Sequence, residues 1–232
     1  MSDNWRTHAK FWSTQYEVHA IDQRNHGKSF HSQEFNYDLM AADIIDYMDE
    51  RNIPQAIVLG HSMGGKTAMS LALQYPSRVS KLIVADIVPK KYDVDTKFSN
   101  IIKGLLHLHN MTIRSRTEAD TLLMPFVPEM GVRQFLLKNL AWTEQKTLSL
   151  RCNIEVLQHK LKEIGAAPAG LPYTGKTLFL AGKQSDYVLQ KDMTVIHGLF
   201  PSASLHWVTD AGHWLHAENP KGFTIALQDF LS

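Results

Sequence analysis

The sequence has little of what cross-linked or membrane-spanning proteins are built from. It contains one cysteine, Cys152, in 232 residues, so no internal disulfide can form. No apolar run approaches the roughly 18 residues that a membrane-spanning helix needs. The segment that begins at Met1 also lacks the apolar core of a secretory signal peptide. These absences predict a cytoplasmic protein without a membrane span.

Charge of one sign is also scarce. Lys and Arg total 24, Asp and Glu total 23, and the net charge at pH 7 is +1. A nucleic-acid groove needs a concentrated basic face, whereas the basic residues here are scattered, with Lys90 and Lys91 the nearest pair of note. We therefore expect no nucleic-acid partner. The hydrophobic content of 44% is that of an ordinary globular chain.

Short apolar runs rich in β-branched residues are present along the chain, and longer helical patterns separate most of them. Near-continuous apolar strands that alternate with helices are typical of a parallel sheet covered on both faces. The sequence therefore predicts an α/β fold with a doubly wound, mostly parallel sheet. A closing helix is expected after Asn219, which fits an N-cap before Pro220. The predicted strands are residues 16–21, 55–60, 81–86, 176–182 and 204–209.

The strand rhythm stops between about Pro89 and Pro172, where apolar residues recur at helical spacing. We assign residues 1–92 and 173–232 to the sheet core and residues 93–172 to a helical insertion. Open α/β sheets bind ligands outside the carboxyl ends of their strands. The place of the insertion in the chain favours a lid over that edge, with an ordinary helical elaboration as the alternative.

The stretch GHSMG, residues 60–64, lies between an apolar run and a helical pattern. It fits the G-x-S-x-G pattern, which places a serine on a tight strand-to-helix turn. Side chains two positions to either side of that serine would collide, and Gly60 and Gly64 remove the collision. The helix N-terminus below the turn favours developing negative charge. The pattern predicts that Ser62 is a nucleophile.

A serine hydroxyl needs a base at pH 7, and the sequence offers 12 histidines. His213 follows the last predicted strand in a short loop and precedes the closing helix. The chain order serine, acid, histidine puts the base there. His216 is the nearest competitor, and we expect it in the helix entry. His61, beside the serine, is expected to have a packing role.

Two aspartates are candidates for the acid that orients His213. Asp86 ends the predicted strand 81–86, and Asp186 follows the predicted strand 176–182. Both lie at carboxyl ends of strands, and both satisfy the order serine, acid, histidine. The general pattern of this architecture places the acid after the later strand, which favours Asp186, but chain order alone leaves both open.

Four stretches together resemble the α/β-hydrolase superfamily and, more narrowly, the small YbfF-type bacterial esterases. The resemblance implies a doubly wound sheet with a helical lid and the hydrolysis of short acyl esters or thioesters through an acyl-enzyme, without metal or organic cofactor. In that subgroup the acid follows the strand after the nucleophile helix, which favours Asp86 over Asp186. The stretches are DQRNHGKS at 22–29, GHSMGGK at 60–66, ADIVP at 85–89 and AGHWLHAENP at 211–220.

The start of the chain departs from that family pattern. Members begin with a strand and a His-Gly loop that supplies one oxyanion N–H, while the other comes from the residue after the nucleophile, here Met63. No such strand precedes Met1 in this sequence. We therefore expect a truncated chain. The alternative is that residues 16–21 pair directly with residues 55–60.

Other functions stay open beside ester hydrolysis. Loss of one oxyanion donor costs about 100- to 1000-fold in turnover, so an inactive truncated homologue that acts as a binding protein is one alternative. A C–C bond hydrolase or a lyase on the same fold is another, because such enzymes keep the serine. Enzymes of this architecture with an aspartate nucleophile do not fit Ser62.

Overall fold

A computed structural model describes residues 1–232, apart from the side chains of residues 95–97. The chain forms two compact units, and each unit is built from two segments. Residues 1–35 and 93–165 form one, which we call the helical unit, and residues 36–92 and 166–232 form the other, the sheet unit. This division differs from the predicted one mainly because residues 1–35 group with the helical insertion. Among the described residues, no helix has both the length and the apolar character needed to cross a bilayer.

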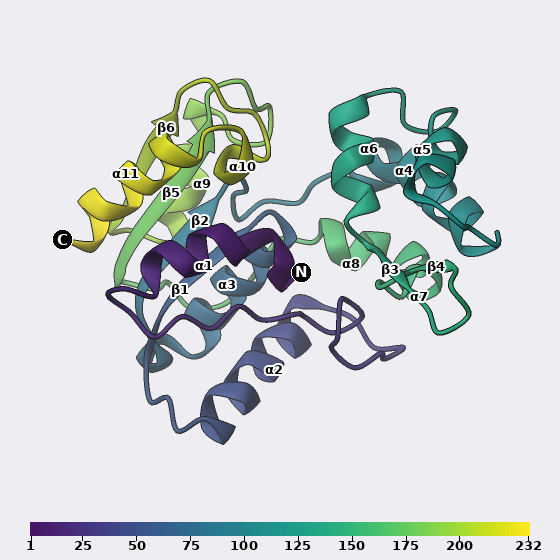
Figure 1. The fold of residues 1–232 in the computed structure, drawn as a ribbon. Coiled ribbons are helices and arrows are strands. Elements are labelled where there is room, and N and C mark those ends of the chain that lie inside the picture. The colour runs from purple at the N-terminus through teal and green to yellow at the C-terminus, as the bar shows by residue number, and fades with distance from the viewer. The chain divides into compact units, whose positions relative to one another are not determined.

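The sheet unit contains four parallel strands in the order β1-β2-β5-β6 (Figure 1). Their carboxyl ends lie at one edge of the sheet, because Gly60 pairs with Val84 and Val84 pairs with Phe179. Four of the five predicted strands are thereby confirmed to within two residues at each end. The strands are β1 Ala56–His61, β2 Val79–Ala85, β5 Lys176–Gly182 and β6 Ala203–Val208.

The predicted strand at residues 16–21 is wrong, and so is its direct pairing with residues 55–60. This segment belongs to the helical unit and is irregular, with Tyr16 and Val18 exposed. Alternating apolar residues make a strand only where a neighbouring strand satisfies the backbone N–H and C=O groups. The structure gives residues 16–21 no such neighbour, and β2 is the strand that pairs with β1.

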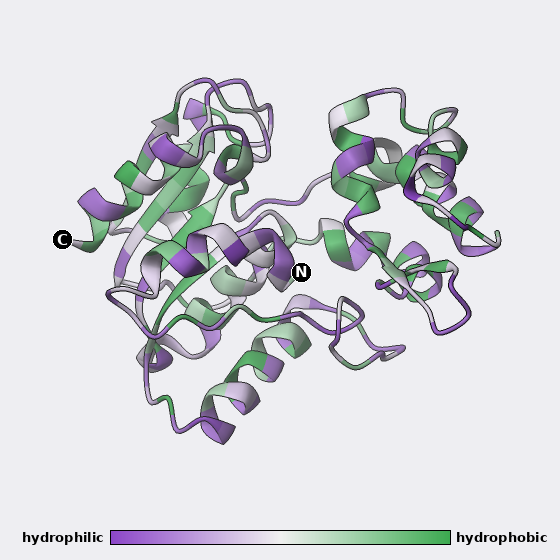
Figure 2. Ribbon diagram, in the orientation of Figure 1, coloured by the Kyte–Doolittle hydropathy of each residue, from purple (hydrophilic) through white to green (hydrophobic). Residues whose placement is uncertain are grey.

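Helices of the sheet unit pack against the strands. Helix α3 packs on β1 and β2, and α11 packs on β5 and β6. Strands β2 and β5 are almost wholly buried, and they carry the hydrophobic colour in Figure 2. The predicted cap of the closing helix is confirmed, because the Asn219 side chain accepts from the Gly222 N–H. The helices are α2 Tyr37–Glu50, α3 Met63–Gln74, η2 Pro76–Arg78, η3 Gln190–Asp192, α9 Met193–Leu199, α10 Leu215–Glu218 and α11 Pro220–Leu231.

Lys66 on α3 is buried where the chain enters and leaves the sheet unit. Its Nζ donates to the carbonyl of Ala166 and lies 5.6 Å from the ring centre of Tyr37 and 4.9 Å from that of Tyr92. Tyr92 is the last residue of one segment of this unit, Ala166 is the first of the other, and Tyr37 is second in its segment. Burial lowers the pKa of Lys66 to about 8. One ammonium group thus contacts all three places where the chain passes from one unit to the other.

The helical unit contains helices and a short antiparallel hairpin, β3-β4. Residues 93–172 were predicted to be a helical insertion, but α6 ends at Leu137 and residues 140–142 pair with 148–150 in the hairpin. The elements are η1 Ser2–Trp5, α1 Arg6–Trp12, α4 Val94–His109, α5 Arg116–Leu123, α6 Met130–Leu137, β3 Leu140–Trp142, β4 Leu148–Leu150, α7 Ile154–His159 and α8 Leu161–Gly165.

The loop at residues 22–32 of the helical unit is held by its own polar groups. Asn25 is fully buried in the left-handed region (φ 63°), and its side chain bonds the N–H and the carbonyl of Ser32. His26 Nδ1 lies 3.0 Å from the Arg24 carbonyl oxygen. Since a carbonyl can only accept, Nδ1 carries the proton. Burial lowers the pKa of His26 to about 4.

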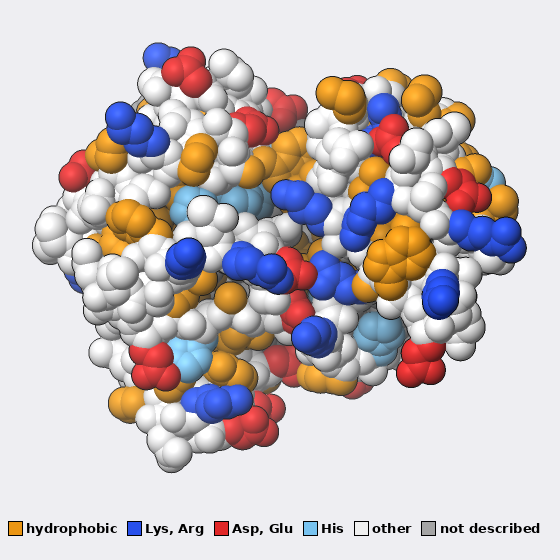
Figure 3. Space-filling view, viewed as in Figure 1, with side chains coloured by type: hydrophobic (Ala, Val, Ile, Leu, Met, Phe, Trp, Pro, Cys, Tyr) orange, Lys and Arg blue, Asp and Glu red, His pale blue; other side chains and the backbone are white. Residues whose placement is uncertain are grey.

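The surface in Figure 3 carries basic and acidic side chains on each unit. Side chains of the two signs lie near one another on this face (Figure 3), and no single sign covers it.

Candidate active site

Ser62 stands on a strained turn between β1 and α3. Its backbone has φ 53° and ψ −120°, a conformation that side chains rarely adopt. The Ser62 N–H donates to the Ala85 carbonyl at 3.0 Å, which ties the turn to β2. A Cβ on Gly60 would lie 2.7 Å from the Gly65 nitrogen and closer still to the Gly64 carbonyl. The glycine at position 60 is therefore what lets the turn close.

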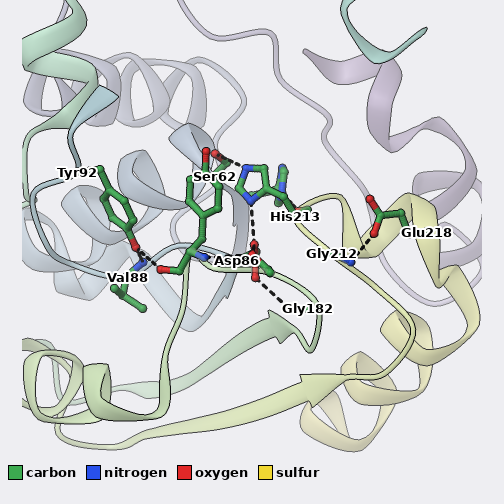
Figure 4. Close-up of polar contacts among 11 residues, drawn as sticks. Ser62, Asp86, Val88, Tyr92, Gly182, Gly212, His213 and Glu218 are labelled. Carbon is green, nitrogen blue, oxygen red and sulfur yellow. Dashed lines mark hydrogen bonds and ion pairs between the residues drawn. The ribbon is translucent and has the colours of Figure 1, made fainter. Parts of the chain in front are cut away.

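His213 lies in the loop between β6 and α10, as the sequence predicted. Its Nε2 is 3.0 Å from Ser62 Oγ, although the two residues are 151 positions apart (Figure 4). The side chain is 15% exposed, so one edge of the imidazole remains open to solvent. The ring stacks on Tyr187, with centroids 3.9 Å apart and planes 20° from parallel. Tyr187 is in turn held by Tyr92, whose hydroxyl donates to the Tyr187 carbonyl at 2.8 Å.

Asp86 follows β2, and its carboxylate is the group beside His213. Asp86 Oδ2 lies 2.8 Å from His213 Nδ1, and the side chain is 0% exposed. Asp86 Oδ1 accepts from the Gly182 N–H at 2.9 Å, and Oδ2 also accepts from the Ser185 hydroxyl. An ionised carboxylate only accepts, so Nδ1 of His213 is the protonated nitrogen. The Nε2 lone pair then faces the hydroxyl of Ser62 (Figure 4).

The structure separates the two candidate acids. Asp186 is exposed in the loop after β5, whereas Asp86 is wholly buried and contacts His213. Asp86 itself has φ 49°, and its N–H donates to the Leu180 carbonyl at 2.7 Å. This backbone conformation turns the carboxylate toward the Gly182 N–H. Of the other histidines considered, His216 lies in α10 and is buried.

Met63 is the first residue of α3. The first N–H groups of an α-helix have no partner inside the helix, and the positive end of the helix dipole lies there. Met63 therefore places a backbone N–H of the first turn of α3 directly after Ser62.

Two residues of the site were not singled out from the sequence. Gly182 and Ser185 both bond the Asp86 carboxylate. A Cβ on Gly182 would also lie 2.7 Å from the Ala211 carbonyl, so this glycine lets the loop that carries His213 approach β5. The glycine at a strand end and the hydroxyl next to Asp186 were the available signals. They indicated a polar loop after β5, but they did not indicate that this loop bonds the carboxylate of Asp86.

The arrangement forms a continuous set of hydrogen bonds from a buried carboxylate through an imidazole to a serine hydroxyl. Such a set can remove the proton from the hydroxyl and stabilise the imidazolium that results. Among the described residues, no three His, Cys, Asp or Glu side chains are grouped so that they could hold a metal ion.

Comparison with known proteins places these features in a family context. The family described as "alpha/beta hydrolase fold" matches residues 1–123. The sn-1-specific diacylglycerol lipase ABHD11 of Danio rerio is 37% identical over 220 residues, which are 93% of this chain and 69% of that protein. Esterase YbfF of Escherichia coli is 31% identical over 230 residues, covering 99% and 88% of the two chains. A solved structure of a "marine microorganism esterase" is 36% identical, with a TM-score of 0.92 and coverage of 99% and 90%.

Proposed function

Because the chain belongs to the α/β-hydrolase fold family, we infer that it is an ester-hydrolysing enzyme and that it cleaves short acyl esters or thioesters through an acyl-enzyme on Ser62. The observation that carries this proposal is the pair of hydrogen bonds that join Ser62, His213 and Asp86. A serine that is held on a strained strand-to-helix turn in contact with an imidazole is typical of a nucleophile.

The geometry assigns a role to each group in the proposed reaction. His213 Nε2 takes the proton of Ser62 Oγ as that oxygen attacks the acyl carbonyl. The carbonyl oxygen becomes an oxyanion, and the Met63 N–H donates to it. His213 then gives the proton to the departing alcohol or thiol. In the second half, His213 takes a proton from water as the water oxygen attacks the acyl carbon. The bond from that carbon to Ser62 Oγ then breaks, and His213 returns the proton to Ser62 Oγ, so that the acid is released and the serine hydroxyl is restored.

Asp86 holds the imidazole in the required tautomer during both halves. It is wholly buried, and three donors contact its carboxylate: Nδ1 of His213, the Gly182 N–H and the Ser185 hydroxyl. Those donors satisfy the carboxylate without protonating it. The negative charge therefore stays beside the imidazolium when the imidazolium forms.

We infer the substrate class from the names of similar proteins. Two are named for ester hydrolysis, one as an esterase and one as a diacylglycerol lipase. A carboxylic ester is the bond common to both. Thioesters have the same acyl carbonyl and a better leaving group, so the same attack applies to them.

The test is hydrolysis of p-nitrophenyl acetate, p-nitrophenyl butyrate, a short acyl thioester and a dispersed diacylglycerol by the full chain and by Ser62→Ala. We expect turnover of at least the two p-nitrophenyl esters and a loss of about 10⁶-fold in kcat for Ser62→Ala, as for other serine hydrolases that lose the nucleophile. A fluorophosphonate probe should label wild type and leave Ser62→Ala unlabelled.

The same assays separate the alternatives. Labelling without ester turnover would favour a C–C bond hydrolase or a lyase, which diketone substrates would then detect. Absence of both labelling and turnover in a folded chain would favour a binding protein. Ester turnover that survives in Ser62→Ala would contradict the proposed nucleophile.

A further inference from the structure

His61 is the last residue of β1 and stands next to Ser62, yet its ring is bonded to the loop of His213. Nε2 of His61 lies 2.6 Å from the backbone carbonyl oxygen of His213, 152 positions away. The two rings are also in contact, with centroids 4.7 Å apart and planes tilted by 46°. No part of the proposed acyl transfer uses this side chain.

The protonation of His61 follows from that contact. A carbonyl oxygen can only accept, so Nε2 of His61 is the donor and carries the proton. Burial, and then repulsion from the neighbouring rings of His213 and His216, lower the pKa of His61 well below its ordinary value. The second of those rings lies 4.8 Å away. His61 is therefore a neutral ring in one tautomer, and it adds no positive charge beside an imidazolium on His213.

The loop that carries His213 is held at several points, and the bond from His61 is the one made to the backbone of His213 itself. The Ala211 carbonyl accepts from the Gln184 N–H at 2.9 Å. On the side before His213, the Gly212 N–H donates to the Glu218 carboxylate. His61 holds the residue itself, by its carbonyl, while Asp86 holds its ring at Nδ1. These two bonds, one to the backbone and one to the ring, act together with the stacking of the ring on Tyr187 to set the direction of Nε2 of His213.

We propose that His61 is a positioning residue for the general base, and that its Nε2–H bond to the His213 carbonyl keeps His213 Nε2 aimed at Ser62. The inference rests on the proposed function, since it assigns His61 a role in the same acyl transfer. His61 touches neither Ser62 Oγ nor the substrate in this role, and it acts only through His213.

If His61 only filled space, position 61 would need a side chain of the right size and no hydrogen-bond donor. A side chain of similar size and no polarity would then serve as well as histidine, and a polar amide would serve worse. Positioning demands a donor at the place of Nε2. Gln reaches about as far as Nε2 and ends in an N–H donor, whereas Leu has comparable bulk and no donor.

The experiment compares His61→Gln and His61→Leu with wild type in the full chain, by kcat and KM for p-nitrophenyl butyrate. Thermal unfolding is measured alongside. We expect His61→Leu to lose about 10- to 100-fold in kcat with KM changed less than threefold, because a shift of about 1 Å in a catalytic group costs up to 100-fold. His61→Gln should stay within about fivefold of wild type.

Nitrogen-15 spectra of the histidine rings give a readout that needs no activity. We expect the Nε2–H tautomer for His61 in wild type and a changed His213 ring signal in His61→Leu. Equal kcat for the Leu and Gln variants, or an Nδ1–H tautomer of His61, would overturn the inference while esterase activity stands. An inactive wild type would overturn the proposed function, and the tautomer would then still test the bond.

Discussion

At the scale of single residues, the wholly buried carboxylate of Asp86 determines which ring nitrogen of His213 carries the proton. An amide in its place could present an N–H to Nδ1 and so favour the wrong tautomer of the imidazole. We expect Asp86→Asn to lower kcat by about 10⁴-fold, the loss seen when a serine protease acid is replaced in this way.

Asp186→Asn is the matched control, because Asp186 also follows a strand but is exposed. Its kcat for p-nitrophenyl acetate should stay within about twofold of wild type, as is usual for a surface substitution away from the chemistry. A large loss for Asp186→Asn and a small one for Asp86→Asn would reverse the assignment of the acid.

The hydroxyl of Ser185 is the second residue-scale feature, since it donates to the same oxygen of Asp86 that faces His213. A hydrogen bond to a charged group contributes about 1.5–3 kcal/mol, so Ser185→Ala should lower kcat by about 10- to 100-fold. Ser202→Ala removes a hydroxyl whose bond is to the exposed Thr174 carbonyl, and it should leave kcat unchanged. Steady-state kinetics of the two variants decide whether Ser185 supports the acid.

At the scale of elements, the turn from β1 to α3 depends on Gly60. A Cβ there would meet the backbone of the first turn of α3, so Gly60→Ala must displace either the turn or the helix. We expect a loss of more than about 100-fold in kcat, from misplacement of Ser62, and a lower unfolding temperature.

Gly198→Ala is the control for that substitution. Gly198 lies in α9, and a Cβ there would meet nothing within 4 Å. Because Ala is about 0.5–1 kcal/mol better than Gly inside a helix, this variant should be as stable as wild type or more so, with unchanged kcat. Equal effects of the two glycine substitutions on turnover would contradict the account of the turn.

Elements with their own hydrophobic period could be predicted from the sequence. Strands β2 and β5 are buried on both faces and read as continuous apolar runs, and α11 carries its own cap at Asn219. Residues 16–21 show the same local pattern as a strand and yet form none, because pairing depends on a neighbour that the segment itself does not contain. The hairpin at 140–142 and 148–150 was missed for the opposite reason. Its strands have three residues each, too few to show a period.

The choice between Asp86 and Asp186 likewise could not be made from local sequence. Asp86 and Asp186 both follow strands whose carboxyl ends lie at one edge of the sheet, so position in the chain could not choose between them. The choice depends on φ at Asp86 and on which carboxylate meets the Gly182 N–H. Both are properties of the folded backbone. The places of Ser62 on a strand-to-helix turn and of His213 in the loop after the last strand were predictable, because a short motif and chain order define them.

At the scale of the whole molecule, we expect the protonation of His26 to contribute to the pH dependence of the free energy of unfolding. Its pKa in the folded protein is about 4, against 6.5 for the ordinary group. Between these values the unfolded chain binds a proton that the folded chain does not, so stability rises with pH across this window. The full contribution, about 3 kcal/mol for 2.5 pKa units, is present above pH 6.5 and is lost as the pH falls toward 4.

His26→Asn provides the comparison, since Asn offers an N–H near the place of Nδ1 and does not titrate. Urea unfolding at pH 4.5 and pH 7 should show a smaller loss of stability on acidification for His26→Asn than for wild type. Parallel losses in the two proteins would mean that His26 does not titrate as its burial implies.

The contacts of Lys66 have a consequence for how this architecture can change over evolutionary time. The chain leaves the sheet unit after Tyr92 and re-enters it at Ala166, and both residues contact the same ammonium group. A segment whose two ends lie close together can become longer or shorter, or be replaced by another segment, without displacing the strands of the sheet unit. Ser62, Asp86 and His213 all belong to the sheet unit. The segment between Tyr92 and Ala166 can therefore change in length and sequence while these three residues keep their places.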